Sequence, residues 1–475
     1  MKVSFRNIVF LVGIFCVPTI VWAAGGQTSA VGDFNGDGND DIAVGIFDDF
    51  VSGKKRAGSV NVQYSTKNRR DFAGITNQLR QGSFPADDEP EDGDSFGRAL
   101  ASGDFDGDGY YDLAVGAPYE DLGNRSDLGV VHAFYGNVSG LNRVGGSRNE
   151  LWSQDRLNLS QAPEHTGFGG TLVSGDFNGD GYYDLVATSY QASRELGFIN
   201  VIRGSEAGLV AAGARLWSKA DLGFPISQIG GKGAFSALAV GDFNGDDFDD
   251  LAIGAASHDV RYENKTYQNA GVVFIIFGSP SGLSVTSPPR FQTVGPGQPG
   301  LDVVVNPKEH LGLGRALAVG DFNGDDFDDL AMSRPGTILY SGVSSTSWTS
   351  TAYGPGEVFT VAGGEMGLGP VTPIPMTRST AARSGVANVN DRFGEQLASH
   401  DINADGFDDL LVSTQAVPFQ GRVAIFMLKG GNPMNREHTT FWDLNAIMAT
   451  FQERRKRNPQ DDDDRPTVPG NSGRR

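Results

Sequence analysis

The chain has 475 residues and a formal net charge of -20, with 58 Asp and Glu residues against 38 Lys and Arg residues. This acidic balance argues against a nucleic-acid-binding protein, because binding to phosphates requires a basic surface. Hydrophobic residues make up 39% of the chain and aromatic residues 10%, which is enough for a packed core and excludes a wholly disordered protein. A single cysteine excludes a disulfide-stapled scaffold.

Residues 1–24 are predicted to be a signal peptide. Lys2 and Arg6 precede an apolar run at Ile8–Ile20, the order that secretory signals share. The run is shorter than the roughly 20 residues that cross a bilayer, which favours export over an anchor. Cleavage would remove Cys16 and leave a mature chain of charge -22 without disulfides. We therefore expect a secreted, periplasmic or cell-surface protein with no membrane span in the mature chain.

One nine-residue pattern, rich in Asp, Asn and Gly, occurs six times. The copies begin 66 to 80 residues apart, and each is followed at once by a short apolar run such as Leu113–Val115. They span residues 33–41, 104–112, 176–184, 242–250, 321–329 and 401–409. Such a regular period indicates a repeat architecture in which each copy belongs to one structural unit.

Each unit contains further strand signals around its loop. A Phe-Gly pair or a near equivalent precedes five loops, as at Phe96-Gly97, and a Gly followed by β-branched residues comes after each loop, as at Gly129–Val131. Four of these later runs end in a Gly-Leu turn, as at Gly140-Leu141. A unit of about four short strands cannot bury both faces of its sheet alone, so the units must stack. The sequence thus predicts an all-β fold, a β-propeller of six four-stranded blades, with the shorter-period β-solenoid as the alternative.

These motifs resemble those of a known family. The span from Phe96-Gly97 to Gly116-Ala117-Pro118, with its loop between, is similar to the FG-GAP repeats of the integrin α-subunit N-terminal β-propeller. The resemblance covers residues 25–445, the predicted propeller domain. Propellers of that family usually have seven blades, whereas six loops are present, so the resemblance leaves six or seven blades open. It also implies that the loops hold calcium and that ligands meet the opposite face.

The loop residues themselves favour calcium. Ca²⁺ takes about 6 to 8 oxygen ligands, and carboxylate or amide oxygens stand at loop positions one, three and five, with a carbonyl at position seven and Asp at position nine. The candidate ligands are Asp33, Asn35, Asp37, Asn39 and Asp41; Asp104, Asp106, Asp108, Tyr110 and Asp112; Asp176, Asn178, Asp180, Tyr182 and Asp184; Asp242, Asn244, Asp246, Phe248 and Asp250; Asp321, Asn323, Asp325, Phe327 and Asp329; and Asp401, Asn403, Asp405, Phe407 and Asp409. We therefore expect up to six Ca²⁺ ions.

An EF-hand and a metal-free turn are the alternatives to such a calcium loop. An EF-hand would need flanking helices and a Glu at position twelve, whereas strands are expected around these loops. A metal-free turn would also be rich in Asp, Asn and Gly, because these are ordinary turn residues. Sixfold repetition of the same oxygen pattern favours the metal.

The six loops are not equivalent. Asp247 and Asp326 replace the Gly at position six, where a positive φ is expected, and should strain their turns. The last loop has Ala404 at position four and His400 before it, and it should bind most weakly. The loops hold 25 of the 58 acidic residues, and without them the mature chain would carry a charge of only +3. Calcium should therefore contribute directly to the folding free energy.

The chain end beyond the propeller has a different composition. Residues 446–475 are predicted to form a short helix, which begins near Asp443, and then a disordered tail with a basic block at 454–457 and an acidic block at 461–464.

No catalytic residues are assigned from the sequence. Gly93–Gly97 matches the Gly-x-Ser-x-Gly pattern around a nucleophilic serine, but that motif requires a strand-to-helix turn. The six His residues lack metal-ligand spacing.

Binding is the favoured function. The connections that the resemblance places on the ligand face span residues 46–57, 117–128, 256–270 and 333–356, and they carry Arg and aromatic residues suited to protein or glycan ligands. The Ser/Thr-rich stretch 341–351 within the last connection is expected to be flexible. The leading hypothesis is a calcium-binding adhesion or recognition module with an extracellular protein or glycan ligand. The alternative is an extracellular hydrolase or lyase that acts on lipid or polysaccharide.

Overall fold

The structure is a computed structural model. It describes residues 29–443 except for 66–75, 83–87, 142–147, 158–165, 192–195, 219–220, 222–234, 236, 263, 285–290, 296–311, 336, 345–346, 354–355, 370–375, 377–391, 402–404, 416–422 and 430–434. The predicted signal peptide (1–24) and the predicted helix and tail (446–475) lie outside the described residues.

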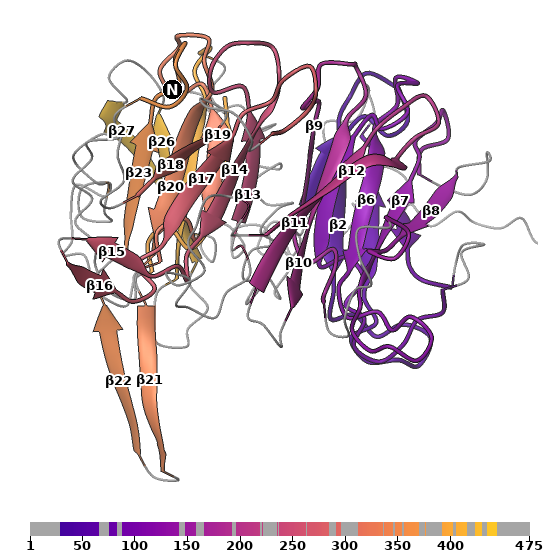
Figure 1. Ribbon diagram of the computed structural model, residues 1–475, viewed down its shortest axis with the longest axis horizontal. Coiled ribbons are helices and arrows are strands. Elements are labelled where there is room, and N and C mark those ends of the chain that lie inside the picture. The colour runs from indigo at the N-terminus through magenta and orange to yellow at the C-terminus, as the bar shows by residue number, and fades with distance from the viewer. Residues whose placement is uncertain are drawn as a thin grey trace, which may run out of the picture.

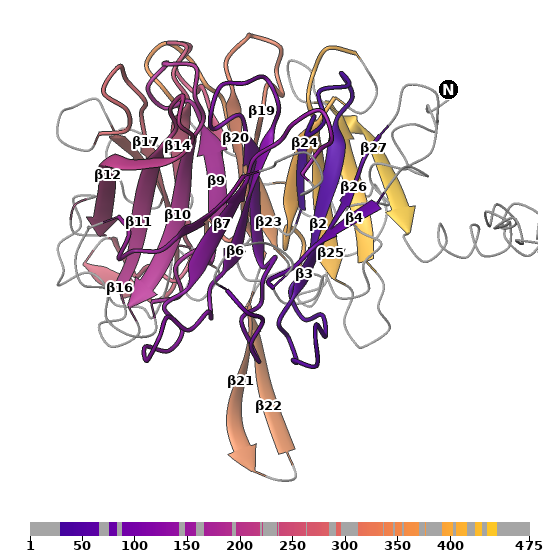
Figure 2. The same ribbon diagram turned by 90° about the vertical axis from the view of Figure 1, so that its right-hand side faces the viewer.

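The described part of the chain is built from antiparallel strands and contains no helix that could cross a membrane. Six sheets follow one another along the sequence, and five of them have four strands. Figures 1 and 2 show these sheets arranged around a common axis, with their strands running roughly along it. The predicted all-β propeller is therefore confirmed, with six sheets in the described residues.

Each sheet takes its strands from one repeat unit. The first holds β1 (Ser29–Gly32), β2 (Asp41–Ile46), β3 (Ser59–Gln63) and β4 (Thr76–Leu79); the second, β5 (Ala99–Gly103), β6 (Asp112–Ala117), β7 (Val130–Phe134) and β8 (Asn149–Trp152); the third, β9 (Leu172–Gly175), β10 (Asp184–Gln191), β11 (Leu196–Arg203) and β12 (Val210–Ser218). The fourth holds β13 (Ala237–Gly241), β14 (Asp250–Ala255), β17 (Val272–Ile276) and β18 (Phe291–Val294); the fifth, β19 (Leu317–Gly320), β20 (Asp329–Arg334) and β23 (Glu357–Val361); the sixth, β24 (Leu397–His400), β25 (Asp409–Gln415), β26 (Val423–Lys429) and β27 (Asn435–Asp443).

Two hairpins are inserted between second and third strands. β15 (Val260–Tyr262) pairs with β16 (Lys265–Tyr267), and β21 (Thr337–Ser344) pairs with β22 (Ser347–Tyr353). Figure 2 shows that the β21–β22 ribbon projects from one end of the molecule. The expectation that residues 341–351 are flexible is wrong, because all of them except 345–346 lie in these two strands. The alternating β-branched and aromatic residues there suit a paired strand.

The core lies between neighbouring sheets. The first strands of consecutive units contact one another in the order β1, β5, β9, β13, β19 and β24, whereas β24 and β1 have at most marginal contact among the described residues. Five hydrophobic clusters fill the five seams between consecutive sheets. Phe96, Phe168 and Phe393, the aromatic residues of the Phe-Gly pairs, are fully buried in them.

The Phe-Gly pair allows the backbones of two sheets to come close together. Gly97 has φ of 85°, and its N–H donates to the carbonyl oxygen of Gly116 at the end of β6 (3.0 Å). A Cβ atom on Gly116 would collide with the carbonyl oxygen of Gly169, the Phe-Gly glycine of the next sheet. The two glycines of the motif therefore serve inter-sheet packing as well as local turns.

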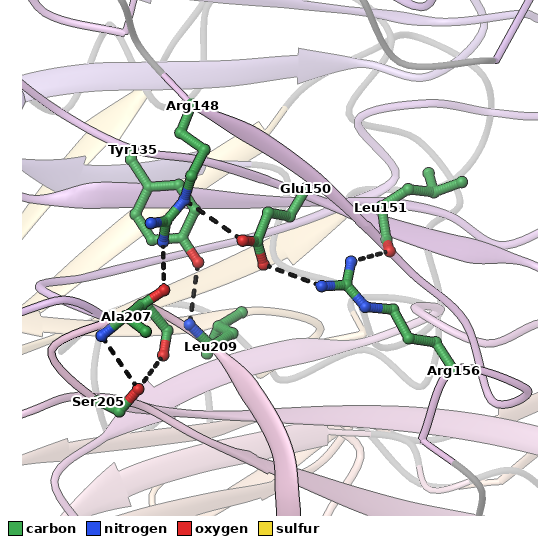
Figure 3. A network of polar contacts seen from close by, with 9 residues as sticks. Tyr135, Arg148, Glu150, Leu151, Arg156, Ser205, Ala207 and Leu209 are labelled. Atoms are coloured by element: carbon green, nitrogen blue, oxygen red, sulfur yellow. Dashed lines mark hydrogen bonds and ion pairs between the residues drawn. The ribbon is translucent and has the colours of Figure 1, made fainter.

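The Gly-Leu turns also join neighbouring sheets. Figure 3 shows one such latch, in which the Tyr135 hydroxyl oxygen accepts a hydrogen bond from the backbone N–H of Leu209 (2.9 Å) and Arg148 donates to the Ala207 carbonyl oxygen (2.7 Å). The Arg148 guanidinium lies 3.8 Å from the centre of the Tyr135 ring. Equivalent bonds join the Tyr64 hydroxyl to Leu141 N–H (2.7 Å), Arg203 to the Ser281 carbonyl (2.7 Å) and the Gln292 side-chain carbonyl to Leu368 N–H (3.0 Å).

Removal of one latch hydroxyl should weaken the fold. Tyr135→Phe leaves the buried Leu209 N–H without its acceptor, and we expect a loss of about 1 to 3 kcal/mol in the free energy of unfolding, measured by urea denaturation at fixed calcium. Tyr267→Phe, in the β15–β16 hairpin outside the six sheets, is the matched control and should change stability by less than about 0.5 kcal/mol. Equal effects of the two variants would contradict the role of the latch.

Candidate metal loops and the opposite end

All six candidate loops connect the first strand of a sheet to the second strand. Because the strands are antiparallel, these connections lie together at one end of the propeller, and the connections between second and third strands lie at the other end. The β21–β22 ribbon marks that second end in Figure 2. The molecule therefore has a loop end and an opposite end, as the resemblance implies.

The Asp at position one shapes each loop through backbone hydrogen bonds. In the second loop, Asp104 Oδ1 accepts from Gly107 N–H (2.7 Å) and Oδ2 accepts from Gly109 N–H (2.9 Å). Bonds from the backbone at positions five and six recur at Asp33, Asp176, Asp242, Asp321 and Asp401. A shared hydrogen-bond pattern thus gives six separate sequences the same turn.

Position six requires a left-handed backbone. Gly109 has φ of 89°, and the two residues that replace Gly at this position keep a positive φ, 65° at Asp247 and 67° at Asp326. Because this region is unfavourable for a residue with a Cβ atom, the predicted strain at these two positions is confirmed.

Oxygen atoms at position three are the observation that fits a cation. Asp106 Oδ1 and Asn244 Oδ1 are buried and have no hydrogen-bond partner in the described structure. Ligand atoms of Asp104, Asp106 and Asp108 lie within 4.8 Å of one another. The second loop alone has a carboxylate at position three, since the other five have Asn there. These clustered and partly unsatisfied oxygens suit a hard cation such as Ca²⁺.

The Asp at position nine is buried beneath the loop and joins it to the third strand. Asp112 Oδ2 accepts from Phe105 N–H and its Oδ1 from Gly136 N–H (2.8 Å each), and Asp250 has the same two bonds. Burial raises the pKa of Asp41 to about 7, of Asp112 to about 8, of Asp184 to about 7, of Asp250 to about 8 and of Asp329 to about 6. Position nine thus carries a structural role besides the ligand role predicted from the sequence.

The predicted aromatic anchor at position two is confirmed, and positions seven and eight have a role that sequence reasoning missed. The position-two side chains Phe34, Phe105, Phe177 and Phe243 are fully buried, and Phe322 is nearly so. The ring of Tyr182 at position seven lies against Gly107 of the preceding loop, where a Cβ atom would come within 2.6 Å of it. At position eight, Asp249 Oδ2 accepts from Asp176 N–H of the preceding loop (2.7 Å). Consecutive loops are thus bonded to each other.

The last loop is described only in part. Residues 402–404, which include Asn403 and Ala404, lie outside the described structure. Its predicted weakness therefore stays a prediction.

The Gly-x-Ser-x-Gly match has no nucleophile geometry. Ser95 is fully buried, its hydroxyl lies 3.1 Å from the carbonyl oxygen of Gly93, and strand β5 rather than a helix follows. A nucleophilic serine must be exposed to substrate at a strand-to-helix turn. Ser95 accordingly belongs to the Phe-Gly turn.

The opposite end has a cavity of about 590 Å³ between the first two sheets. Its lining is mostly acidic, with Glu91, Asp92, Asp94, Asp121 and Asp127 beside Arg56, Tyr119, Gly93 and Ser126. Tyr119 is 39% exposed, and Phe50, on the neighbouring connection 46–57, is 63% exposed. Two of the four connections predicted to meet ligands therefore come together around an acidic and aromatic surface.

Behind the cavity lies a buried polar group that we call the seam cluster: Gln81, Asp88, Asp94, Glu120 and His132. All five side chains are at least 94% buried. His132 Nε2 lies 2.8 Å from Asp88 Oδ2, and Gln81 Nε2 donates to both Asp88 Oδ2 (3.1 Å) and Glu120 Oε2 (2.6 Å). No local motif identified these residues in the sequence, because they are spread over five separate positions.

Electrostatics distinguish the three carboxyl groups of the seam cluster. Burial, and then repulsion by Asp88, raises the pKa of Glu120 to about 10, and burial raises that of Asp94 to about 6. Burial alone would also raise the pKa of Asp88, but its hydrogen bond to His132 and the charge of that residue outweigh burial and lower it. The cluster therefore holds more acid than its own partners neutralise.

Comparison with known proteins gives the family. The FG-GAP repeat family matches residues 25–60, 96–134, 168–211, 234–276, 313–348 and 393–426, one match for each sheet. The chain is an integrin-like FG-GAP repeat protein. It is 30% identical to integrin alpha-PS2 of Drosophila melanogaster over 255 residues, which covers 52% of this chain and 16% of that protein.

Two further similarities lie outside the integrins. The FG-GAP protein is 31% identical to phosphatidylinositol-glycan-specific phospholipase D of Bos taurus over 209 residues, 42% of this chain and 22% of that enzyme. Among solved structures, rhamnogalacturonan lyase YesW matches 88% of this chain and 73% of its own with 13% identity and a TM-score of 0.35. The chain thus spans less than a quarter of the length of the integrin and the phospholipase that it matches.

The difference at position three provides a reciprocal test of the loops. Asp106→Asn gives the second loop the composition of the others and should reduce its calcium affinity, by about tenfold or less, while it raises stability in chelator because a buried repulsive charge is removed. Asn178→Asp makes the opposite change in the third loop and should have opposite effects. Isothermal titration with Ca²⁺ and thermal melts measure both. Parallel changes in the two variants would contradict the assignment of position three.

Proposed function

We propose that this FG-GAP protein is an exported, calcium-stabilised propeller that recognises an extracellular protein or glycan through the end opposite to its metal loops. The observation that carries the proposal is the division between the two ends. One end repeats a single carboxylate loop six times, whereas the other end differs from unit to unit and carries the cavity and the inserted hairpins.

Calcium in the loops is supported by their oxygen atoms. The buried, unpartnered Asp106 Oδ1 and Asn244 Oδ1 need a donor or a cation, and the three clustered carboxylates of the second loop repel one another in the absence of one. Up to six ions, one for each loop, would offset this repulsion. Since consecutive loops are bonded through position eight, each ion would also stiffen a seam between sheets.

Recognition at the opposite end is supported by its surface. Phe50 and Tyr119 expose large apolar or aromatic area on connections outside the six sheets, and Arg56 and the carboxylates around the cavity offer hydrogen bonds. Aromatic and charged residues on rigidly held loops are typical of protein and glycan recognition. The variability of this end suits a binding surface, because the repeat itself does not require it.

Removal of calcium should lower the melting temperature strongly. A site that is filled at 100 times its Kd contributes about 2.7 kcal/mol, and several such sites act together. Thermal melts in excess chelator and in millimolar Ca²⁺ measure the difference, with Mg²⁺ as the control cation. An unchanged melting temperature in chelator would contradict calcium stabilisation.

Ligand contact is tested by matched pairs of exposed residues. Phe50→Ala and Tyr119→Ala should each weaken binding to a ligand found by glycan-array and extracellular-protein screens, by tenfold or more if the residue is a central contact, about 1.4 kcal/mol. Val138→Ala and Met366→Ala remove equally exposed apolar side chains, 78% and 83% exposed, at the loop end and should leave binding unchanged. The reverse pattern would place the ligand at the loop end.

The alternative function is an extracellular hydrolase or lyase. Its support is the buried carboxyl pair of Asp94 and Glu120 beside the cavity, since carboxyl groups with raised pKa values are used in acid–base catalysis. Turnover of a glycan lipid or a polysaccharide by the purified protein in calcium, abolished by Asp94→Asn, would favour this alternative over recognition alone.

A further inference from the structure

The seam cluster is not part of the repeat. Through the register Val115↔His132, the position of His132 corresponds to Asn61 in the first sheet and to Phe274 in the fourth. Glu120, eight residues after the last Asp of its loop, corresponds to Asp49 and to His258, and the backbone carbonyl oxygen at this position accepts the same inter-strand hydrogen bond in each case. The fold therefore forms without these side chains in other units, and their presence in the second unit needs its own explanation.

The cluster is also costly as it stands. Asp88, Asp94 and Glu120 are 6%, 2% and 3% exposed, and Glu120 shares side-chain hydrogen bonds with both of the other carboxyl groups. His132 supplies at most one positive charge against the three carboxyl groups. Buried carboxylates are stable only when they are paired, protonated or bound to a cation.

An unsatisfied amide oxygen distinguishes a cation from shared protons. Gln81 is 4% exposed, and its carboxamide lies against two of the carboxyl groups, yet Oε1 has no hydrogen-bond partner in the described structure. A half-turn of the carboxamide would leave Nε2 without a partner instead and would turn Oε1 toward Asp88. An ion that accepts oxygen ligands satisfies Oε1 and separates the carboxylates at the same time.

We propose that the seam cluster binds one calcium ion, distinct from those of the six loops. The three carboxylates and Gln81 Oε1 supply four ligand groups, and the cavity, which Asp94 lines, admits the ion and water for the remaining positions of a shell of about 6 to 8 oxygens. The carboxyl groups lie in pairwise contact rather than around one centre, so binding opens the Asp88–Glu120 contact. His132 then holds Asp88 in place as a partner outside the ligand shell.

The consequence is a cation at the wall of the acidic cavity. The ion would neutralise part of the negative charge around Asp94 and fix the connections that carry Tyr119 and Glu91 to one another. Its site joins the segment after β4 to the β6–β7 connection, so it would bridge the first two sheets at the end opposite to the loops. This inference does not depend on ligand recognition or on how many loops are filled.

The experiment counts calcium in the intact protein. Equilibrium dialysis in Ca²⁺ buffer followed by elemental analysis should find one ion fewer per chain in Glu120→Gln than in the wild type. Asp49→Asn, at the equivalent position of the first sheet, is the control and should retain the wild-type number. Asp88→Asn is a second cluster variant in case the first does not fold, as judged by circular dichroism.

Stability and diffraction complete the test. In chelator, Glu120→Gln should melt no lower than the wild type, because it removes a buried charge, and Ca²⁺ should raise its melting temperature by less. Crystals soaked in Tb³⁺ should show an anomalous peak between Asp88 and Glu120. Equal calcium counts in wild type and cluster variants, or an equal loss of stability with and without calcium, would overturn the proposal.

Discussion

The structure depends on the seams between consecutive sheets. A four-stranded sheet of this size has two faces, and neither can be buried within its own unit. Each described seam therefore combines a hydrophobic cluster, a Phe-Gly pair set against the backbone of its neighbour, and hydrogen bonds at the loop end. Because every one of these contacts joins residues of successive units, a unit is stable only in its place in the array.

The same seams explain why the negative charge is tolerated. The loops gather 25 of the 58 acidic residues at one end, and burial of their last Asp raises its pKa in five of them. The carboxylates are arranged by backbone N–H groups of their own loop and, through Asp249 and Asp328, of the preceding one. Loop geometry and seam geometry are thus one network, and a cation in a loop acts on the packing of two sheets.

Sequence reasoning was sufficient where a pattern is local. The alternation around each loop predicted β2 and its equivalents, and Phe105 was correctly placed as a buried anchor, since these residues act within about ten positions of one another. The partners of Tyr135 and Asp249 lie 74 and 73 residues away in another unit, and no local pattern marks them. The β21–β22 ribbon was mistaken for a flexible segment because Ser and Thr are common in both strands and loops.

Departures from the repeat are the most informative residues of such a fold. A side chain found in every unit is explained by the seam that it builds, as with Phe96 and Phe168. Asp40, at position eight of the first loop, is exposed, whereas Asp249 and Asp328 at that position are bonded to a preceding loop. The first loop thus keeps an acidic group that its equivalents use to hold a neighbour.

The seam cluster is the opposite departure, in which one unit buries acidic groups that its equivalents lack. Asn61 and Phe274 stand where the second unit has His132, so packing between sheets accepts neutral residues at that position. A buried acid that the fold does not need is retained against a desolvation cost of several kcal/mol for each ion. Such a cost indicates a bound ligand more strongly than any feature that the six units share.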